Sequence, residues 1–157
     1  MIVLKFEKEI KGSCTEAKHK DQIVVDNISF SSSRYVQLND GERQMGVAAV
    51  SQIMLTKRID ISSPDLWIQA TVGASLGKAV VHSMHAVGSG DQPATYMTLT
   101  LADAVISHYG VEIMADGSRE CIYISYSAME YEYVQYDNST KIGESKKSYD
   151  LLKRKVG

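Results

Sequence analysis

The sequence predicts a mainly-β domain, a small antiparallel β-barrel of two sheets with one α-helix on one side. Short stretches of alternating apolar and polar residues, separated by turn signals, run along most of the chain. Most connections between them are too short for parallel crossovers, so antiparallel neighbours are expected. Only one segment is bounded like a helix. About seven or eight strands are expected, and the unpaired strands at the sheet edges must be paired or covered. Closing the sheet into a barrel meets this requirement.

Length and composition indicate a single domain over residues 1–157, with 44% hydrophobic and 23% charged residues. The net charge of -2 offers no electrostatic case for binding nucleic acid or an acidic membrane. No apolar stretch is long enough for a signal peptide or a membrane span. Two cysteines, Cys14 and Cys121, do not make a disulfide framework, and we expect reduced thiols.

Three strands are expected before the helix. In chain order they cover residues 2–10, 22–31 and 47–57. A long polar loop over residues 31–46 separates the second strand from the third, with a turn signal at Asn39-Asp40-Gly41. Loops of this length in a compact domain are usually functional or mobile.

The single helix is expected to run from Ser63 to Gly73. Ser63 can act as the N-cap, and Pro64 suits the first helical position, where the missing N–H costs nothing. Gly73 favours a stop, because glycine accepts a left-handed conformation. Trp67, the only tryptophan, is interpreted as the core anchor that packs this helix against a sheet.

Four strands are expected after the helix. They cover residues 78–87, 94–107, 119–136 and 144–152. Turn signals lie at residues 88–93 and at Asp116-Gly117. The basic tail, residues 153–157, is expected to be frayed and solvated.

No residue pattern in the chain indicates an active site, a cofactor site or a metal site. His82 and His85 are three apart in an expected strand, so they point to opposite faces. Neither cysteine belongs to a pair with the spacing of metal ligands. A hydrolase that uses His82 or His108 with a nearby acid remains an alternative, and it requires these groups to converge in a cleft.

Four segments in register resemble the haemolysin-coregulated protein (Hcp) family, the inner-tube proteins of bacterial type VI secretion systems. They are Lys11-Gly12-Ser13 with His19 and the strand Ile23 to Phe30; Leu55-Thr-Lys-Arg-Ile-Asp60 with Ser62-Ser-Pro-Asp-Leu-Trp67 and Gly73; Tyr96 to Ser107; and Ser127-Ala-Met-Glu-Tyr-Glu-Tyr133. The chain departs from the family pattern at Cys14, at Tyr149 in place of tryptophan, and in the 31–46 loop.

The resemblance implies a structural protein rather than an enzyme. Six copies would form a ring, and rings would stack into a tube that a contractile sheath expels from the cell. The implied partners are other copies of the chain, the sheath, the baseplate, VgrG-type spike proteins and small secreted effectors sheltered in the lumen. The protein would be made in the bacterial cytoplasm and secreted without a signal peptide, and no additional effector domain is expected after the last strand.

The resemblance also suggests where contacts lie. The 31–46 loop would contact the next ring, and Ser29, a small polar residue on an otherwise apolar strand, would face the lumen. The expected stacking residues are Arg34, Tyr35, Gln37, Asn39 and Arg43. Arginine and tyrosine give large contact areas and directional donors.

Two further readings stay open. A monomeric small-ligand-binding β-barrel would have a closed apolar cavity and form no ring. A divergent paralogue would form rings without building a tube. The reason for this alternative is that the 31–46 loop departs from the family pattern.

Overall fold

The computed structural model describes residues 1–87 and 93–157, so most of the turn expected at 88–93 lies outside the described residues. The described strands are β1 (Ile2–Phe6), β2 (Ile23–Val25), β3 (Asn27–Ser29), β4 (Ser32–Asn39), β5 (Glu42–Val50), β6 (Ile53–Lys57), β7 (Ala79–Ala86), β8 (Pro93–Ala102), β9 (Val105–Met114), β10 (Gly117–Ser125), β11 (Ala128–Asp137), β12 (Thr140–Asp150) and β13 (Lys155–Val156). The helices are the 3₁₀ helix η1 (Ala17–His19) and α1 (Ser63–Val72).

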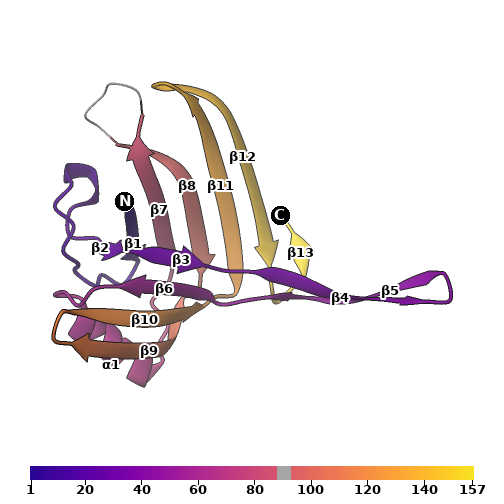
Figure 1. Cartoon of the computed structure of the whole chain (residues 1–157), viewed down its shortest axis with the longest axis horizontal. Helices are drawn as coiled ribbons and strands as arrows, with labels where there is room; N and C mark the ends of the chain where they lie inside the picture. The colour runs from indigo at the N-terminus through magenta and orange to yellow at the C-terminus, as the bar shows by residue number, and fades with distance from the viewer. Residues whose placement is uncertain (88–92) are drawn as a thin grey trace.

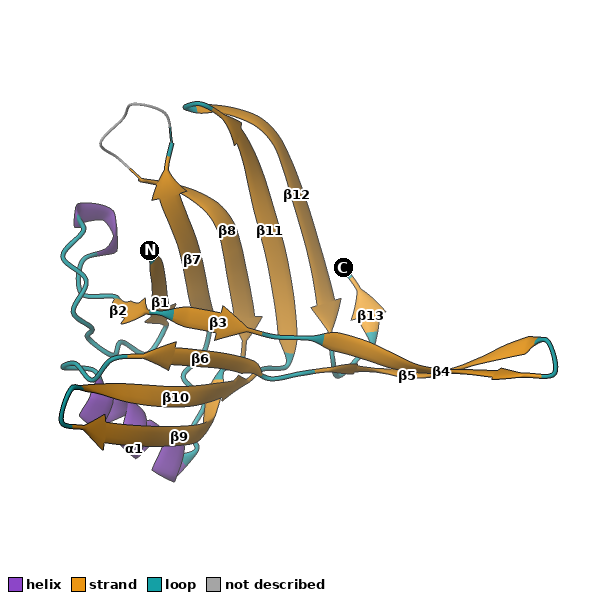
Figure 2. Ribbon diagram, in the orientation of Figure 1, coloured by secondary structure: helices purple, strands orange, loops and turns teal. Residues whose placement is uncertain are grey.

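The strands form three antiparallel sheets, and the predicted mainly-β class with one α-helix is confirmed (Figures 1 and 2). The seven-stranded sheet has the order β13-β12-β11-β8-β7-β1-β2, and the four-stranded sheet has the order β3-β6-β10-β9. Strands β4 and β5 form a separate two-stranded sheet that projects away from the other two (Figure 1).

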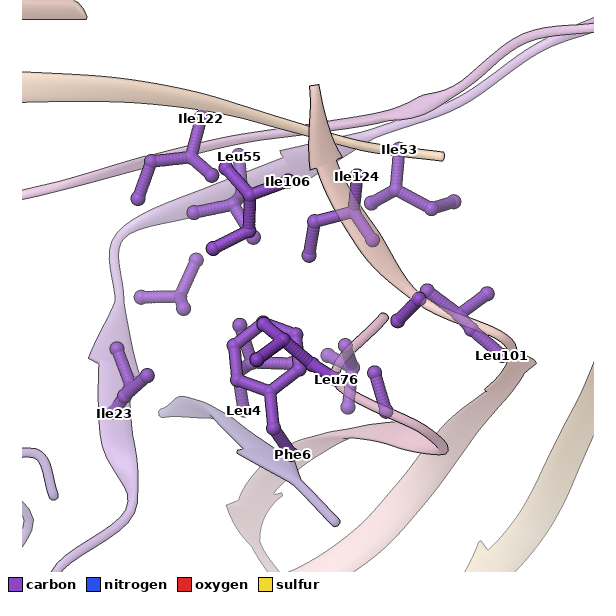
Figure 3. Packing of buried hydrophobic residues seen from close by; sticks show 14 of the residues in the cluster. Leu4, Phe6, Ile23, Ile53, Leu55, Leu76, Leu101, Ile106, Ile122 and Ile124 are labelled. Atoms are coloured by element: carbon purple, nitrogen blue, oxygen red, sulfur yellow. The ribbon is translucent and has the colours of Figure 1, made fainter. Parts of the chain in front are cut away.

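The core lies between the seven-stranded and four-stranded sheets (Figure 3). Its fully buried side chains include Leu4, Phe6, Ile23, Ile53, Leu55, Leu99, Leu101, Ile106, Ile122 and Ile124. Alternation along the strands produces this arrangement, since successive side chains point to opposite faces. In β6, for example, Ile53 and Leu55 are buried, while Met54 between them is only half-buried.

Two predicted strands are wrong in length, because each divides at a corner between sheets. The expected strand 94–107 divides into β8 and β9 at Asp103, where φ is 50°. The expected strand 119–136 divides into β10 and β11 at Tyr126 and Ser127. In each case the chain leaves one sheet and enters the other, as strands do at the corners of packed sheets.

Three smaller predictions also need correction. The expected strand 22–31 consists of β2 and β3, which belong to different sheets. The expected strand 47–57 consists of the end of β5 and all of β6. The tail is not wholly frayed, because β13 pairs with β12 through Tyr149 and Val156.

Helix α1 begins and ends almost where the sequence predicts. The N-cap is Ser62 rather than Ser63, so Pro64 is the second helical residue rather than the first, still within the first turn. Gly73 ends the helix in a left-handed conformation with φ of 70°, and its N–H donates to the carbonyl of Gln69. The Ser63 hydroxyl instead accepts the N–H of Asp60, which holds the loop before the helix.

The interpretation of Trp67 as the core anchor is wrong. Its side chain is 56% exposed, whereas the neighbouring Leu66 is fully buried in the main core. Consecutive helical residues lie about 100° apart, and here Leu66 faces the core while Trp67 faces outward. Leu66, with Ala70 beside the core, fastens the helix to the sheets.

Candidate functional site

The projecting β4–β5 hairpin is the most exposed part of the fold, and every residue of β4 is exposed. The expected loop over residues 31–46 is therefore wrong, because these residues form paired strands. The predicted turn signal is confirmed. Asp40 and Gly41 connect the strands with φ of 45° and 82°, and two positive φ values match the strand twist in a two-residue hairpin loop.

One face of the hairpin carries three of the expected stacking residues. Tyr35, Gln37 and Asn39 alternate along β4 and therefore share a face. The Gln37 amide donates to Asn39 Oδ1 at 3.3 Å. Tyr35 is 71% exposed, so this face presents an aromatic ring and amide groups to the surroundings.

The opposite face carries the two expected arginines and an apolar row that sequence reasoning missed. Arg34, Val36 and Leu38 alternate along β4, and β5 places Met45 opposite Val36 and Arg43 opposite Leu38. Val36, Leu38 and Met45 are 47%, 77% and 55% exposed. The alternation of residues 34–38 was the signal available in the sequence, but the polar composition of the segment concealed it.

The formal charges of the hairpin cancel, because Arg34 and Arg43 balance Asp40 and Glu42. The hairpin therefore offers shape, apolar surface and hydrogen-bonding groups rather than a net charge.

Ser29 lies on the outer face of the four-stranded sheet. Ser29 of β3 pairs with Met54 of β6. Met54 in turn pairs with Tyr123 of β10, and Tyr123 pairs with His108 of β9. This row crosses all four strands and faces away from the core, because the alternate positions, such as Leu55 and Ile122, are buried. A surface pocket of about 530 Å³ lies along the row.

A buried polar network fixes the loop between β6 and α1. Lys57 Nζ lies 2.5 Å from Glu120 Oε2 and 2.8 Å from Asp60 Oδ1, and both Lys57 and Glu120 are almost fully buried. Tyr109 donates its hydroxyl proton to the other Glu120 oxygen. Sequence reasoning missed this network, although Lys57 and Glu120 lie on the same strand faces as the buried isoleucines.

The network lowers the pKa of Asp60 and raises the pKa of Tyr109. Burial opposes ionisation of Asp60, but hydrogen bonds from Lys57, Ser62 and Ser13 outweigh it, and the pKa of Asp60 lies below its ordinary value. Burial, followed by the hydrogen bond to Glu120, raises the pKa of Tyr109. Both groups therefore keep one protonation state at neutral pH, as a structural network requires.

The histidines of the hydrolase hypothesis lie on different sheets. His82 of β7 contacts His19, with ring centroids 5.2 Å apart, while His108 of β9 lies 4.8 Å from the Tyr123 ring. Burial, then the neighbouring His19, lowers the pKa of His82. Within residues 1–87 and 93–157, no group of three or more His, Cys, Asp and Glu side chains could hold a metal ion.

The pockets of the fold are surface depressions. One of about 530 Å³ lies at the end of the seven-stranded sheet, between Lys78, Glu130 and Lys155. The space between the two large sheets is filled by the packed core. A ligand-binding barrel would need a closed apolar cavity in that position.

Among the helices that the structure describes, none has the length and apolar character to cross a membrane.

Comparison with solved structures shows a shared fold along almost the whole chain. Hcp1 from Salmonella typhimurium matches with a TM-score of 0.80 and 23% identity, over 99% of this chain and 97% of that one. A structure described as a type six secretion system protein matches with a TM-score of 0.87 and 21% identity, over 99% and 98%. A type VI secretion system effector from Yersinia pestis matches with a TM-score of 0.74 and 23% identity, over 96% and 99%.

Among curated proteins, none matches this chain significantly. The family model described as "Type VI secretion system effector, Hcp" matches residues 3–133, which is most of the chain. This match agrees with the shared fold and with the resemblance noted in the sequence. The chain belongs to the Hcp family of type VI secretion systems.

Proposed function

We propose that this chain is a structural inner-tube subunit of a type VI secretion system. Six copies form a ring, and rings stack into a tube that a contractile sheath expels. The observation that carries the proposal is the projecting β4–β5 hairpin, together with family membership. The role is mechanical and requires no catalysis by this chain.

The hairpin supports assembly for a physical reason. A two-stranded hairpin alone is at best marginally stable in water. This one also exposes an apolar row, Val36, Leu38 and Met45, on one face. Burial of apolar area stabilises by about 25 cal/mol per Å², so a surface that covers the row would stabilise the hairpin considerably.

The hairpin is the proposed contact with the next ring. Tyr35, Gln37 and Asn39 would act on one face, and Arg34 and Arg43 on the other. Contacts on both faces fit an element that inserts between two neighbours rather than one that lies flat on a single surface.

The outer face of the four-stranded sheet is the proposed lining of the lumen. Ser29 lies there beside Met54 and Tyr123. Small effectors would be sheltered against this surface. The sheath, the baseplate and a VgrG-type spike are the other proposed partners. The protein would be made in the bacterial cytoplasm and exported by the machine itself.

Electron microscopy of concentrated protein tests the stacking role. We expect wild-type rings to associate into tubes, and an Arg34→Ala/Tyr35→Ala variant to form rings that remain separate. Ile142→Ala, at an exposed position of β12, is the matched control and should stack like wild type. Unchanged tubes from the double variant would contradict the stacking assignment, and wild-type rings that never stack would identify a paralogue that does not build a tube.

A further inference from the structure

A loop closes over the face of the seven-stranded sheet that lies opposite the main core. It consists of residues 11–22 and contains the 3₁₀ helix η1. A small second cluster lies beneath it, formed by Val3, Cys14 and Met84. Val3 is followed in β1 by the core residue Leu4, so this cluster and the main core lie on opposite faces of the sheet.

Two histidines meet where this loop lies on the sheet. His19 ends η1, and His82 lies in β7 opposite Val3 of β1. Their ring centroids are 5.2 Å apart, with an angle of 53° between the ring planes. Both side chains are half-buried, so the fold holds each ring in place while part of it stays in contact with solvent.

Each of the two rings is held through its Nδ1 atom. His19 Nδ1 lies 3.2 Å from Gln22 Oε1, and His82 Nδ1 lies 3.3 Å from Thr98 Oγ1. An oxygen that accepts a proton from Nδ1 fixes the tautomer in which Nε2 carries the lone pair. Metal-bound histidines are usually oriented in this way, by a hydrogen bond from the nitrogen that does not bind the metal. Both rings can therefore offer Nε2 as a ligand.

The distance between the two rings suits a shared ion. Zinc binds an imidazole nitrogen at about 2.0–2.1 Å, which places the ring centre about 3 Å from the metal. Two imidazoles at a tetrahedral angle on one ion therefore have ring centres about 5 Å apart. The separation of His19 and His82, 5.2 Å, agrees with this value.

The charges around the pair also suit a cation. Burial, then the neighbouring His19, lowers the pKa of His82, so at neutral pH His82 is mainly the neutral imidazole that a metal needs. Glu132 lies in the same row of the sheet, because it pairs with Thr98, which pairs with His82. Its carboxylate acts on His82 in the direction that favours positive charge. Lys146, 3.8 Å from Glu132, offsets part of this effect.

A surface depression gives an ion access to the pair. Its volume is about 390 Å³, and its walls include Glu16, His19, Thr95 and Tyr136. Two histidines are fewer than the four ligands of a structural zinc site, so water would complete the coordination. An ion here would be bound at an open site and with modest affinity.

We propose that His19 and His82 together bind a divalent transition cation, with zinc(II) as the test case. Imidazole ligands suit zinc, copper, nickel and iron. The ion would join η1 to β7 and so fasten the loop of residues 11–22 to the sheet. The inference concerns contacts within one chain and goes beyond the proposed tube function, so either can fail without the other.

Equilibrium dialysis of the purified protein against zinc(II) tests the site. We expect one zinc ion per chain in wild type and at least about tenfold weaker binding in His19→Gln and in His82→Gln. His85→Gln and His108→Gln are the matched controls and should bind like wild type, because these rings contact tyrosines rather than another histidine. Circular dichroism verifies that each variant folds.

Cobalt(II) distinguishes this site from one built on a thiol. Cobalt bound by imidazole and water should absorb in the visible range without a thiolate charge-transfer band, and Cys121→Ser should leave the spectrum unchanged. A thiolate band that disappears in Cys121→Ser would overturn the inference.

Protection from diethylpyrocarbonate gives a readout that needs no variant. Zinc(II) should slow the modification of His19 and His82 in wild type and leave His85 and His108 unaffected. Equal zinc binding by wild type and both variants, His19→Gln and His82→Gln, or no protection of the two histidines, would overturn the inference. The pair would then be an ordinary aromatic contact, and the proposed tube function would stand.

Discussion

Lys57 Nζ lies 2.5 Å from Glu120 Oε2, and both side chains are almost completely removed from solvent. The pair joins β6 to β10 in the middle of the four-stranded sheet. Lys57 also binds Asp60 and the carbonyl of Arg58, so the same ammonium group fixes the chain that leads into α1. One buried charge thus couples a sheet, a loop and the only α-helix among the described residues.

Removing one partner of this pair should be costly. Lys57→Met leaves the Glu120 carboxylate buried without its cation, and we expect a loss of about 3–5 kcal/mol in the free energy of unfolding. Urea denaturation measures the change. Lys141→Met, which removes the exposed partner of Glu144, is the matched control and should leave the midpoint unchanged.

The double variant Lys57→Met/Glu120→Leu separates charge burial from packing. Because the buried Glu120 charge is removed and only the less buried Asp60 carboxylate loses its cation, it should regain much of the stability lost in the single variant. If Lys57→Met were no less stable than the Lys141→Met control, the network would have no structural importance.

Acidification should weaken the contact between η1 and the seven-stranded sheet. Burial and His19 lower the pKa of His82 below 6.5, with Glu132 acting in the opposite direction. The folded state therefore binds this proton less tightly than the unfolded state, and stability present above pH 6.5 is lost as the pH falls through the folded pKa. We expect a lower Tm at about pH 5 than at about pH 7.5.

The variant His82→Gln isolates this contribution. Its Tm should fall less over the same pH interval than that of wild type. His108→Gln, whose ring contacts Tyr123 rather than another histidine, should retain the wild-type pH dependence. Equal slopes for His82→Gln and wild type would show that the histidine pair has no part in the pH response.

Gly12 has no room for a side chain. A Cβ at this position would lie 2.3 Å from the Gln22 carbonyl oxygen and 2.5 Å from Ile23 Cα, both backbone atoms. Gly12→Ala must shift the chain there and should cost about 1–3 kcal/mol in thermal or chemical denaturation. Gly143→Ala is the control, since its Cβ would meet only Gln135 Oε1, at 3.8 Å. Equal stabilities of the two variants would exclude this close approach.

Helix α1 should depend on Leu66 and not on Trp67. Leu66→Ala empties a fully buried site and should cost about 2–5 kcal/mol. Trp67→Ala removes a side chain that is 56% exposed and should cost less than about 1 kcal/mol in the single chain. Acrylamide should also quench Trp67 fluorescence efficiently in the folded single chain. A larger loss for Trp67→Ala than for Leu66→Ala would contradict this packing.

Local chemistry made part of the fold predictable from sequence. Pro64 and Gly73 mark the ends of α1 because their backbone preferences act within a few residues, and Asp40-Gly41 marks the hairpin tip for the same reason. The mainly-β class followed from period-two alternation.

The remaining features depend on long-range geometry. The buried positions change phase at the corners, from Leu101 to Ala104 and from Tyr126 to Met129. Apolar residues lie on both sides of each corner, and this concealed where a strand leaves one sheet for the other. Charged residues normally lie in contact with solvent. The burial of Lys57 and Glu120 on strand faces that are otherwise apolar could therefore not be predicted from their residue types. Trp67 was expected to anchor α1 as the only tryptophan, but only the packed structure shows that Leu66 is the residue that meets the core.

The solution mass of the purified protein, measured by light scattering at several concentrations, tests the central claim most directly. We expect a species near six times 17.3 kDa, because the proposed ring has six copies and neighbouring copies would cover the exposed hairpin. A mass of 17.3 kDa at every concentration would contradict the proposed ring, since the exposed apolar row of the hairpin would then remain in water on a single chain.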